Sequence, residues 1–155
     1  VLQNLLNERV SIRDLPTILE GISEACAFTR NVTQLTEHVR SRLARQISEQ
    51  NSTEDNFIPL VTLSAEWEQI FSDSILDQGE DKQLSMAPSQ LQRFIGAVRT
   101  TLDELADKED PPVVLTSPTA RPFVRSIIER FRPATSIMSQ NELHPKAKIK
   151  TLGQI

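Results

Sequence analysis

The side chains best suited to catalysis or metal binding are few and stand apart from one another. The chain has two histidines, His38 and His144, and a single cysteine, Cys26. Neither histidine has a cysteine, an aspartate or the other histidine at the spacing of metal ligands. Cys26 lies near the end of an apolar stripe, and no residue is identifiable as the base that a nucleophile requires. We therefore expect no catalytic residue, no metal site and no cofactor.

The sequence also has no phosphate-binding loop. Its four glycines fit neither the G-x-G-x-x-G pattern nor the Walker pattern. They are Gly21, Gly79, Gly96 and Gly153. The most site-like segment is Thr116–Thr119, at the end of a predicted strand, where ligands favour α/β sheets. The simpler interpretation is a helix cap at Ser117. The carboxylates at the end of the preceding helix are interpreted as solvent-exposed, with a weak cation or partner surface as the alternative. They are Asp103, Glu104, Asp107, Glu109 and Asp110.

Composition narrows the class of protein further. The 155 residues are 38% hydrophobic and 25% charged, with a net charge of −4. This negative balance argues against binding to nucleic acid, which needs a clustered positive surface. A lone cysteine excludes a disulfide framework within the chain. No apolar run approaches the roughly 20 residues that cross a bilayer. Because the sequence begins at Val1 rather than at methionine, we expect it to be a piece of a longer protein.

The first third of the chain has the pattern of amphipathic helices. A short opening helix carries Leu2, Leu5 and Leu6, and apolar residues then recur at intervals of three and four in two longer stretches. These stripes contain Leu15, Ile18, Leu19, Ile22 and Cys26, and then Leu35, Val39, Leu43 and Ile47. Asp14 suits the N-terminal end of the second helix, and Asn31 suits the cap of the third. We predict three helices, with Leu19 in the densest part of their core.

A polar stretch at 50–56 then separates this helical pattern from alternating strands and helices. Strands are predicted at Phe57–Leu63, Val113–Thr116 and Ala134–Met138, with a weaker one at Lys148–Ile155. Pro59 favours a sheet edge or an early strand position. Helices are predicted from Ser64 to Ile75, after Pro88 and after Ser117, with a polar loop at 77–83. Such alternation predicts parallel strands. The fold class is therefore α+β overall: an N-terminal three-helix subdomain over 1–54, followed by a small α/β subdomain over 55–155 with a short, mainly parallel sheet.

Residues 5–20, which read LLNERVSIRDLPTILE, resemble the signature of the FlhA/InvA-type export-gate family. This family comprises the large inner-membrane subunits of flagellar and type III secretion export apparatus, and its pattern L-x-x-E-x-V-S-I-R-[DN]-x-x-T-I-L-E fits at every fixed position. Residues 35–47, 111–116 and 137–143 resemble later family segments in the same order, although Ile137-Met138 replaces the usual Val-Leu pair. The resemblance covers essentially the whole chain. Residues 149–155 resemble the end of a flagellar member rather than a virulence member.

The resemblance implies a non-catalytic role in protein export. Family members have an N-terminal membrane domain in the bacterial inner membrane and a cytoplasmic part, whose third and fourth subdomains would correspond to this chain. The cytoplasmic parts form a nine-membered homo-oligomeric ring. They receive export chaperone–cargo complexes and communicate with the export ATPase complex and with other membrane export-gate subunits. A virulence secretion system is the alternative setting, and a small ligand-binding α/β enzyme domain is a further alternative.

Four arginines are the candidate contact residues between subunits or subdomains: Arg13, Arg40, Arg42 and Arg45. The last three lie off the stripe that begins at Leu35, so we expect their side chains to be exposed. Arginine is favoured at interfaces because its planar guanidinium pairs with carboxylates through two hydrogen bonds. Arg13 would either stabilise the helical part from within or bind a carboxylate across a subdomain or subunit boundary.

Overall fold

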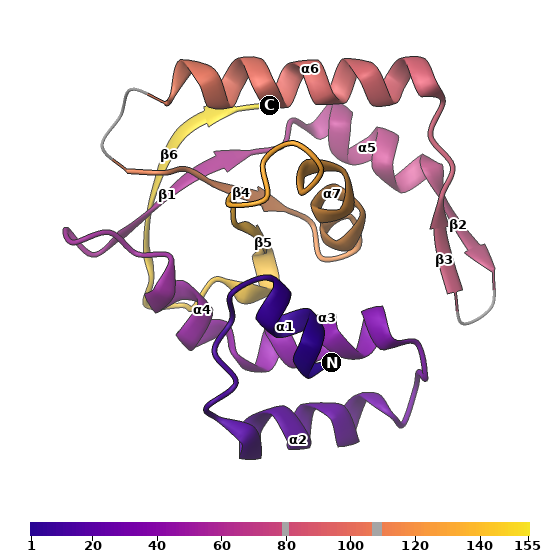
Figure 1. Cartoon of the computed structure of the whole chain (residues 1–155), viewed down its shortest axis with the longest axis vertical. Helices are drawn as coiled ribbons and strands as arrows, with labels where there is room; N and C mark the ends of the chain where they lie inside the picture. The colour runs from indigo at the N-terminus through magenta and orange to yellow at the C-terminus, as the bar shows by residue number, and fades with distance from the viewer. Residues whose placement is uncertain (79–80, 107–109) are drawn as a thin grey trace.

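A computed structural model describes residues 1–78, 81–106 and 110–155. Four helices come first and form the lower tier of Figure 1; we call residues 1–54 the helical part. They are α1 (Leu2–Asn7), α2 (Leu15–Ala25), α3 (Val32–Arg42) and α4 (Ala44–Gln50). The predicted third helix is thus two helices, because the backbone leaves helical geometry at Leu43 (φ −96°, ψ 17°). The prediction of three helices is wrong on this point.

Local sequence signals account for the helix starts. The Asp14 carboxylate accepts a hydrogen bond from the Thr17 amide at the start of α2. The Asn31 side chain accepts one from the Gln34 amide at the start of α3. Each side chain satisfies an amide that the first turn of a helix leaves without a partner. The Asn31 cap was predicted from the sequence, whereas Asp14 was predicted only to favour the positive N-terminal end of its helix.

The rest of the chain, which we call the α/β part, is built on a parallel sheet. Its elements are β1 (Phe57–Thr62), α5 (Ala65–Ser74), β2 (Ile75–Gln78), β3 (Asp81–Leu84), α6 (Pro88–Glu104), β4 (Val113–Thr116), α7 (Arg121–Ile128), β5 (Ile137–Ser139), a 3-10 turn at Gln140–Glu142 and β6 (Lys148–Gln154). The strand order is β5-β4-β1-β6, with every pairing parallel. The predicted α+β class with a mainly parallel sheet is confirmed.

Two details differ from the sequence-based expectations. The polar stretch 77–83 is not a simple loop, because β2 and β3 pair there as an antiparallel ribbon that runs down beside α5 (Figure 1). Pro59 lies in the interior strand β1, so a sheet edge was the wrong alternative. It occupies an early position, where β1 pairs with β6 before its pairing with β4 begins at Leu60.

Strands β1, β4 and β5 are buried on both faces, and their alternating side chains contribute to two apolar cores. Val61, Val114 and Ile137 belong to a core that α5, α6 and α7 complete on one face. Ile58, Leu60, Val113 and Met138 belong to the second core, on the other face. There they pack with buried residues of the helical part, namely Leu5, Val10, Ile18, Val39, Leu43 and Ile47. The helical part therefore completes its core by covering the sheet.

Among the described residues, no helix combines the length and the apolar character that crossing a membrane requires. The longest described helix, α6, runs along the top of the α/β part (Figure 1). Its apolar side packs into the first core through Phe94, Val98 and Leu102.

Candidate functional site: a charged seam and exposed apolar helices

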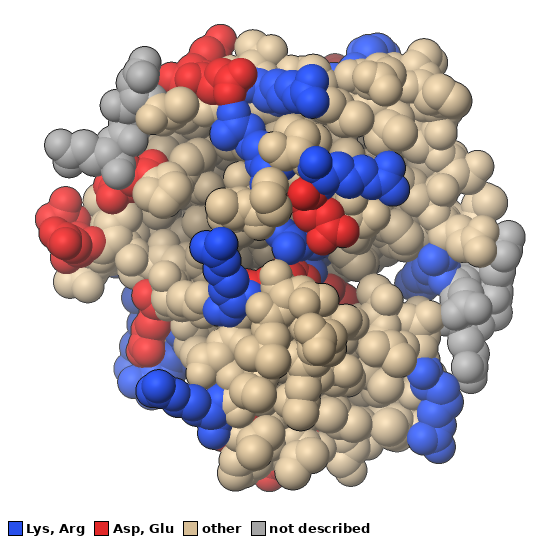
Figure 2. Space-filling view, in the orientation of Figure 1, with Lys and Arg blue, Asp and Glu red and all other residues tan. Residues whose placement is uncertain are grey.

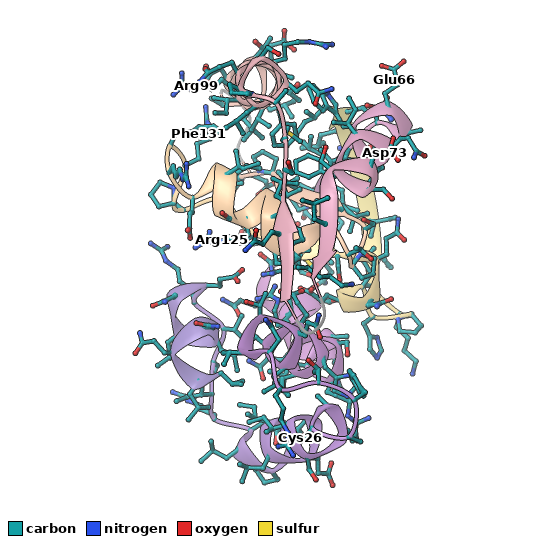
Figure 3. All side chains as sticks on the ribbon, turned by 90° about the vertical axis from the view of Figure 1, so that its right-hand side faces the viewer. Cys26, Glu66, Asp73, Arg99, Arg125 and Phe131 are labelled. Atoms are coloured by element: carbon teal, nitrogen blue, oxygen red, sulfur yellow. The ribbon has the colours of Figure 1, made fainter. Side chains whose placement is uncertain are left out.

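Six ionisable residues meet where the helical part joins the α/β part, and we call this cluster the seam. Helix α3 contributes two, helix α7 contributes two, and the remaining two lie after α1 and in the 3-10 turn. The members are Glu8, Glu37, Arg40, Arg121, Arg125 and Glu142. Charged side chains gather in the middle of the molecule in Figure 2, and Arg125 lies between the two tiers in Figure 3.

Arg121 is the centre of the seam. Its side chain is 1% exposed and forms ion pairs with carboxylates from three separate elements. One terminal nitrogen, Nη1, lies 2.7 Å from Oε1 of Glu37, and the other contacts Glu8. Nε donates to the backbone oxygen of Ile137 over 3.2 Å and lies 3.3 Å from Oε2 of Glu142. Arg121 thus ties α1, α3 and the 3-10 turn to α7.

Arg40 is the second buried cation, and its predicted exposure is wrong. The side chain is only 3% exposed, with Nη2 at 2.5 Å and Nε at 3.0 Å from Oε1 of Glu142. Helix α3 packs against α2 on one side and against α1 and the 3-10 turn on the other. Its buried surface is therefore wider than the apolar stripe and includes Thr36 and Arg40. Burial of the charged Arg40 side chain is possible because Glu142 pairs with it. The local sequence gives no sign of this pair, because Glu142 lies 102 positions further along the chain.

The seam is electrically balanced, with three arginines facing three glutamates. Burial raises the pKa of Glu37 from its ordinary value of 4.5 to about 7, although the charge of Arg121 acts in the opposite direction. Burial alone would lower the pKa of Arg121, but the carboxylates of Glu37, Glu142 and Glu8 raise it overall. The guanidinium therefore remains charged. This arrangement fixes the orientation of two layers of structure, since a buried charge is tolerated only with its partners.

The other predicted arginines lie on the surface, as expected for Arg42 and Arg45, but they do not form one cluster. Arg13 is exposed in the connection before α2. Arg42 is 45% exposed and lies 3.5 Å from Glu20 and 3.7 Å from Glu24, both on α2. Arg45 is 79% exposed and pairs with Glu49 over 3.1 Å on its own helix. Arg42 therefore faces the α2 side of the helical part and Arg45 faces the α4 side. Their contacts with another subunit remain a prediction.

Exposed apolar side chains of the helical part are a feature that the sequence-based interpretation missed. Leu19 is 61% exposed, whereas its neighbour Ile18 is fully buried, so the prediction of Leu19 as a core residue is wrong. Others are exposed on α1, on α2, in the α2–α3 connection and at the start of α3: Leu2, Leu6, Leu15, Phe28 and Val32. The lower part of the view in Figure 2, over α1 and α2, is correspondingly mostly free of charge. The exposure on α2 could have been predicted from the width of its apolar stripe, which is greater than one neighbouring helix covers.

The candidate chemical residues have local structural roles. His38 Nε2 lies 2.9 Å from a carboxylate oxygen of Glu24, and this hydrogen bond lowers the pKa of Glu24. Ser117 accepts a hydrogen bond from the Ala120 amide over 3.3 Å, ahead of α7, which agrees with the cap interpretation.

Cys26 is half-buried. Within the described ranges, no three metal-ligating side chains lie together. In the predicted carboxylate group, Asp103 pairs with Arg132, whereas Asp107 and Glu109 lie outside the described residues.

Comparisons with known proteins give a consistent result. A model of the FHIPEP family matches residues 1–148. The chain is 56% identical over all 155 residues to the flagellar biosynthesis protein FlhA of Caulobacter vibrioides, of which it spans 22%.

Two solved structures share the fold over 99% of this chain. In the complex of Chlamydia pneumoniae CdsV and CdsO, the matching chain is 32% identical, with a TM-score of 0.88 and 45% of that chain covered. The nonameric EscV cytosolic domain from the type III secretion system is 28% identical, with a TM-score of 0.78 and 45% covered.

Proposed function

The chain belongs to the FHIPEP family, and we propose that it is a segment of the cytoplasmic part of a flagellar protein-export gate. The observation that carries this proposal is the 56% identity to Caulobacter FlhA in an alignment that covers the whole chain. Identity to the type III secretion relatives is about half as high, at 32% for CdsV and 28% for EscV. The 56% identity to a flagellar protein favours the flagellar role over the virulence alternative.

The proposed role is assembly and docking rather than catalysis. Since the EscV cytosolic domain is nonameric, we propose that copies of this protein also form a ring of nine in the full-length gate at the inner membrane. A closed ring needs two different, complementary surfaces on each subunit. The helical part offers candidates, because its apolar side chains Leu15 and Leu19 are exposed together with Arg13 and Arg42.

Docking of other export components is part of the same proposal. Since CdsV forms a complex with CdsO, we propose that this chain also contacts export machinery, including the ATPase complex, chaperone–cargo complexes and other gate subunits. The chain spans about a fifth of the length of its curated relatives, so these contacts belong to the whole protein. The buried seam would serve them by holding the helical part at a fixed orientation to the sheet.

A segment exchange in the Caulobacter gate tests the proposal. The matching segment of Caulobacter FlhA is replaced by this chain, and spreading in soft agar is measured. We expect the chimera to support motility, because the two segments share 56% of their residues. The control is a chimera that carries the EscV segment, which we expect to fail. If the chimera with this chain accumulates normally and the cells do not swim, the flagellar assignment is wrong.

A further inference from the structure

A groove between α4 and the start of β6 concentrates positive charge in an otherwise acidic chain. The groove has a volume of about 430 Å³, and its lining includes Arg45, His144, Lys146 and Lys148. Among the described residues that line it, Glu49 is the one carboxylate. The whole chain carries a net charge of −4, so this excess of cations is a local property. The four basic residues come from two segments almost 100 positions apart, α4 and residues 144–148.

The cations of this groove are poorly neutralised by the rest of the molecule. Arg45 pairs with Glu49 over 3.1 Å, but both side chains are more than two-thirds exposed, so this pair contributes little. Lys146 and Lys148 are exposed and form no ion pair with any residue that the structure describes. His144 Nδ1 accepts a hydrogen bond from the Lys146 amide over 3.2 Å. Because Nδ1 accepts this hydrogen bond, Nε2 is the ring nitrogen that is left as a donor.

The groove continues directly into an edge strand. Lys148 lines the groove and is also the first residue of β6, which pairs with β1 on one side and with no further strand in the described parts of the chain. Lys148, Ile149, Lys150 and Thr151 are all exposed, and Ile149 is 53% exposed. An edge strand presents unpaired backbone groups that can template another strand. Backbone donors and acceptors, an apolar side chain and free cations thus lie next to one another.

We propose that the groove and the edge of β6 form a docking site for an extended acidic segment of a partner protein. Carboxylates of the segment would pair with Lys146, Lys148 and Arg45. The following residues would add a strand to β6 and cover Ile149. Addition of a strand supplies affinity through backbone hydrogen bonds, and the side chains that flank the edge supply selectivity.

Other occupants fit the charges less well. Pairing with β6 of a second copy would bring Lys148 and Lys150 against the same lysines, and like charges directly opposite are destabilising. Nucleic acid requires a basic surface that extends over many phosphates, whereas this groove has four basic residues in an acidic chain. Lysines on an edge strand also discourage aggregation. That role does not require Arg45 and His144 to converge on the same groove.

Fluorescence anisotropy of the 155-residue chain with a labelled peptide tests the site. The probe is a short fluorescein-labelled peptide of alternating glutamate and valine, and its counterpart has lysine in place of glutamate. We expect the acidic peptide to bind and the lysine peptide not to bind. Lys146→Glu with Lys148→Glu should weaken binding about tenfold or more, because both charge pairs become repulsive. Both lysines are exposed, so the variant should retain its circular dichroism spectrum.

A matched control makes the same change of net charge elsewhere on the surface. Lys82→Glu with Arg130→Glu alters two exposed cations outside the groove and should leave binding unchanged. Equal weakening by the two pairs, or no binding of the acidic peptide, would overturn the proposal. Hydrogen exchange gives a second readout, since strand addition should protect amides within 149–151. Binding without that protection would overturn the strand pairing. The inference does not rest on the proposed export role, because the measurement uses the isolated chain.

Discussion

The helical part and the α/β part differ in how many of their large apolar side chains are exposed. Among the described residues, the exposed large hydrophobic side chains of the α/β part are Leu76 and Ile149. The helical part, which is shorter, exposes six: Leu2, Leu6, Leu15, Leu19, Phe28 and Val32. Exposed apolar surface on this scale is typical of an interaction site. The α/β part thus buries nearly all of its large apolar side chains, and we propose that the helical part leaves its exposed ones for a partner.

The cores show the same asymmetry. One core lies entirely within the α/β part, between the sheet and helices α5, α6 and α7. The other is shared, because Ile18, Val39 and Ile47 of the helical part pack with Ile58 and Met138 of the sheet. The seam lies beside this shared core and joins the same two layers. The helical part therefore depends on the α/β part for both apolar packing and charge neutralisation. The division at residue 54 remains a prediction about independent folding.

The largest expected effect comes from removing the central cation of the seam. Arg121→Met leaves the carboxylates of Glu8, Glu37 and Glu142 without their shared partner. We expect a loss of about 3–5 kcal/mol in the free energy of unfolding, measured by urea denaturation. The matched control is Arg130→Met at an exposed position of the same region, with an expected change of about 0.5 kcal/mol or less. Equal stability of the two variants would show that the seam does not join the parts.

Two neighbouring residues on α2 lie on different sides of the helix: Ile18 is buried in the shared core, and Leu19 is exposed. Ile18→Ala opens a space in the shared core and should cost about 2–5 kcal/mol. Leu19→Ala, at a side chain that is 61% exposed, should change the stability by about 0.5 kcal/mol or less. Thermal unfolding of both variants checks this contrast. A larger loss at Leu19 than at Ile18 would mean that α2 packs with its opposite side.

These two residues also show where prediction from sequence reaches its limit. Spacing identifies the apolar side of α2, but it does not tell how much of that side a neighbouring helix covers. The same spacing located the stripe from Leu35 to Ile47 correctly, since every member of that stripe is buried. Helix caps such as Asn31 and Ser64 were predictable because their partners lie three residues away.

Long-range charge pairs and the polar ribbon were not predictable in the same way. Arg40 and Glu142 are 102 positions apart, so no local pattern connects them. Strands β2 and β3 contain charged residues such as Asp77 and Lys82 and lack the alternation that marks a half-buried strand. Their pairing depends on the ends of α5 and α6, which hold the two segments side by side. The family, in contrast, was recognisable from residues 5–20 alone.

A smaller, pH-dependent effect is expected at Glu37. Since burial raises the pKa of this carboxyl to about 7, the folded chain binds a proton there more tightly than the unfolded chain does. The stabilising contribution is present below the ordinary pKa of 4.5 and is lost as the pH rises through about 7. Relative to Glu37→Gln, the wild-type chain should therefore lose stability between about pH 5 and about pH 8. Urea denaturation across this range checks the slope, and parallel curves for the two proteins would contradict it.

Surface arginines should affect function with little change in stability. Arg42 pairs with Glu20 and Glu24 on α2, whereas Arg45 lines the groove beside β6. In the Caulobacter chimera, Arg42→Glu should reduce motility, and the melting temperature of the isolated chain should stay within the range of a surface substitution. Arg130→Glu, at an exposed position outside the helical part and outside the groove, is the matched control and should leave motility unchanged. Normal motility of the Arg42→Glu chimera would remove this arginine from the contacts between subunits.

The most direct test concerns the exposed leucines of α2, because the account assigns them to assembly rather than to the core. Leu15→Glu with Leu19→Glu is introduced into the Caulobacter chimera, and motility is measured beside the thermal unfolding of the isolated chain. We predict loss of motility with a melting temperature close to that of the parent chain, since both side chains are exposed. Normal motility, or loss of motility that is matched by unfolding of the isolated chain, would contradict the assignment of this face to assembly.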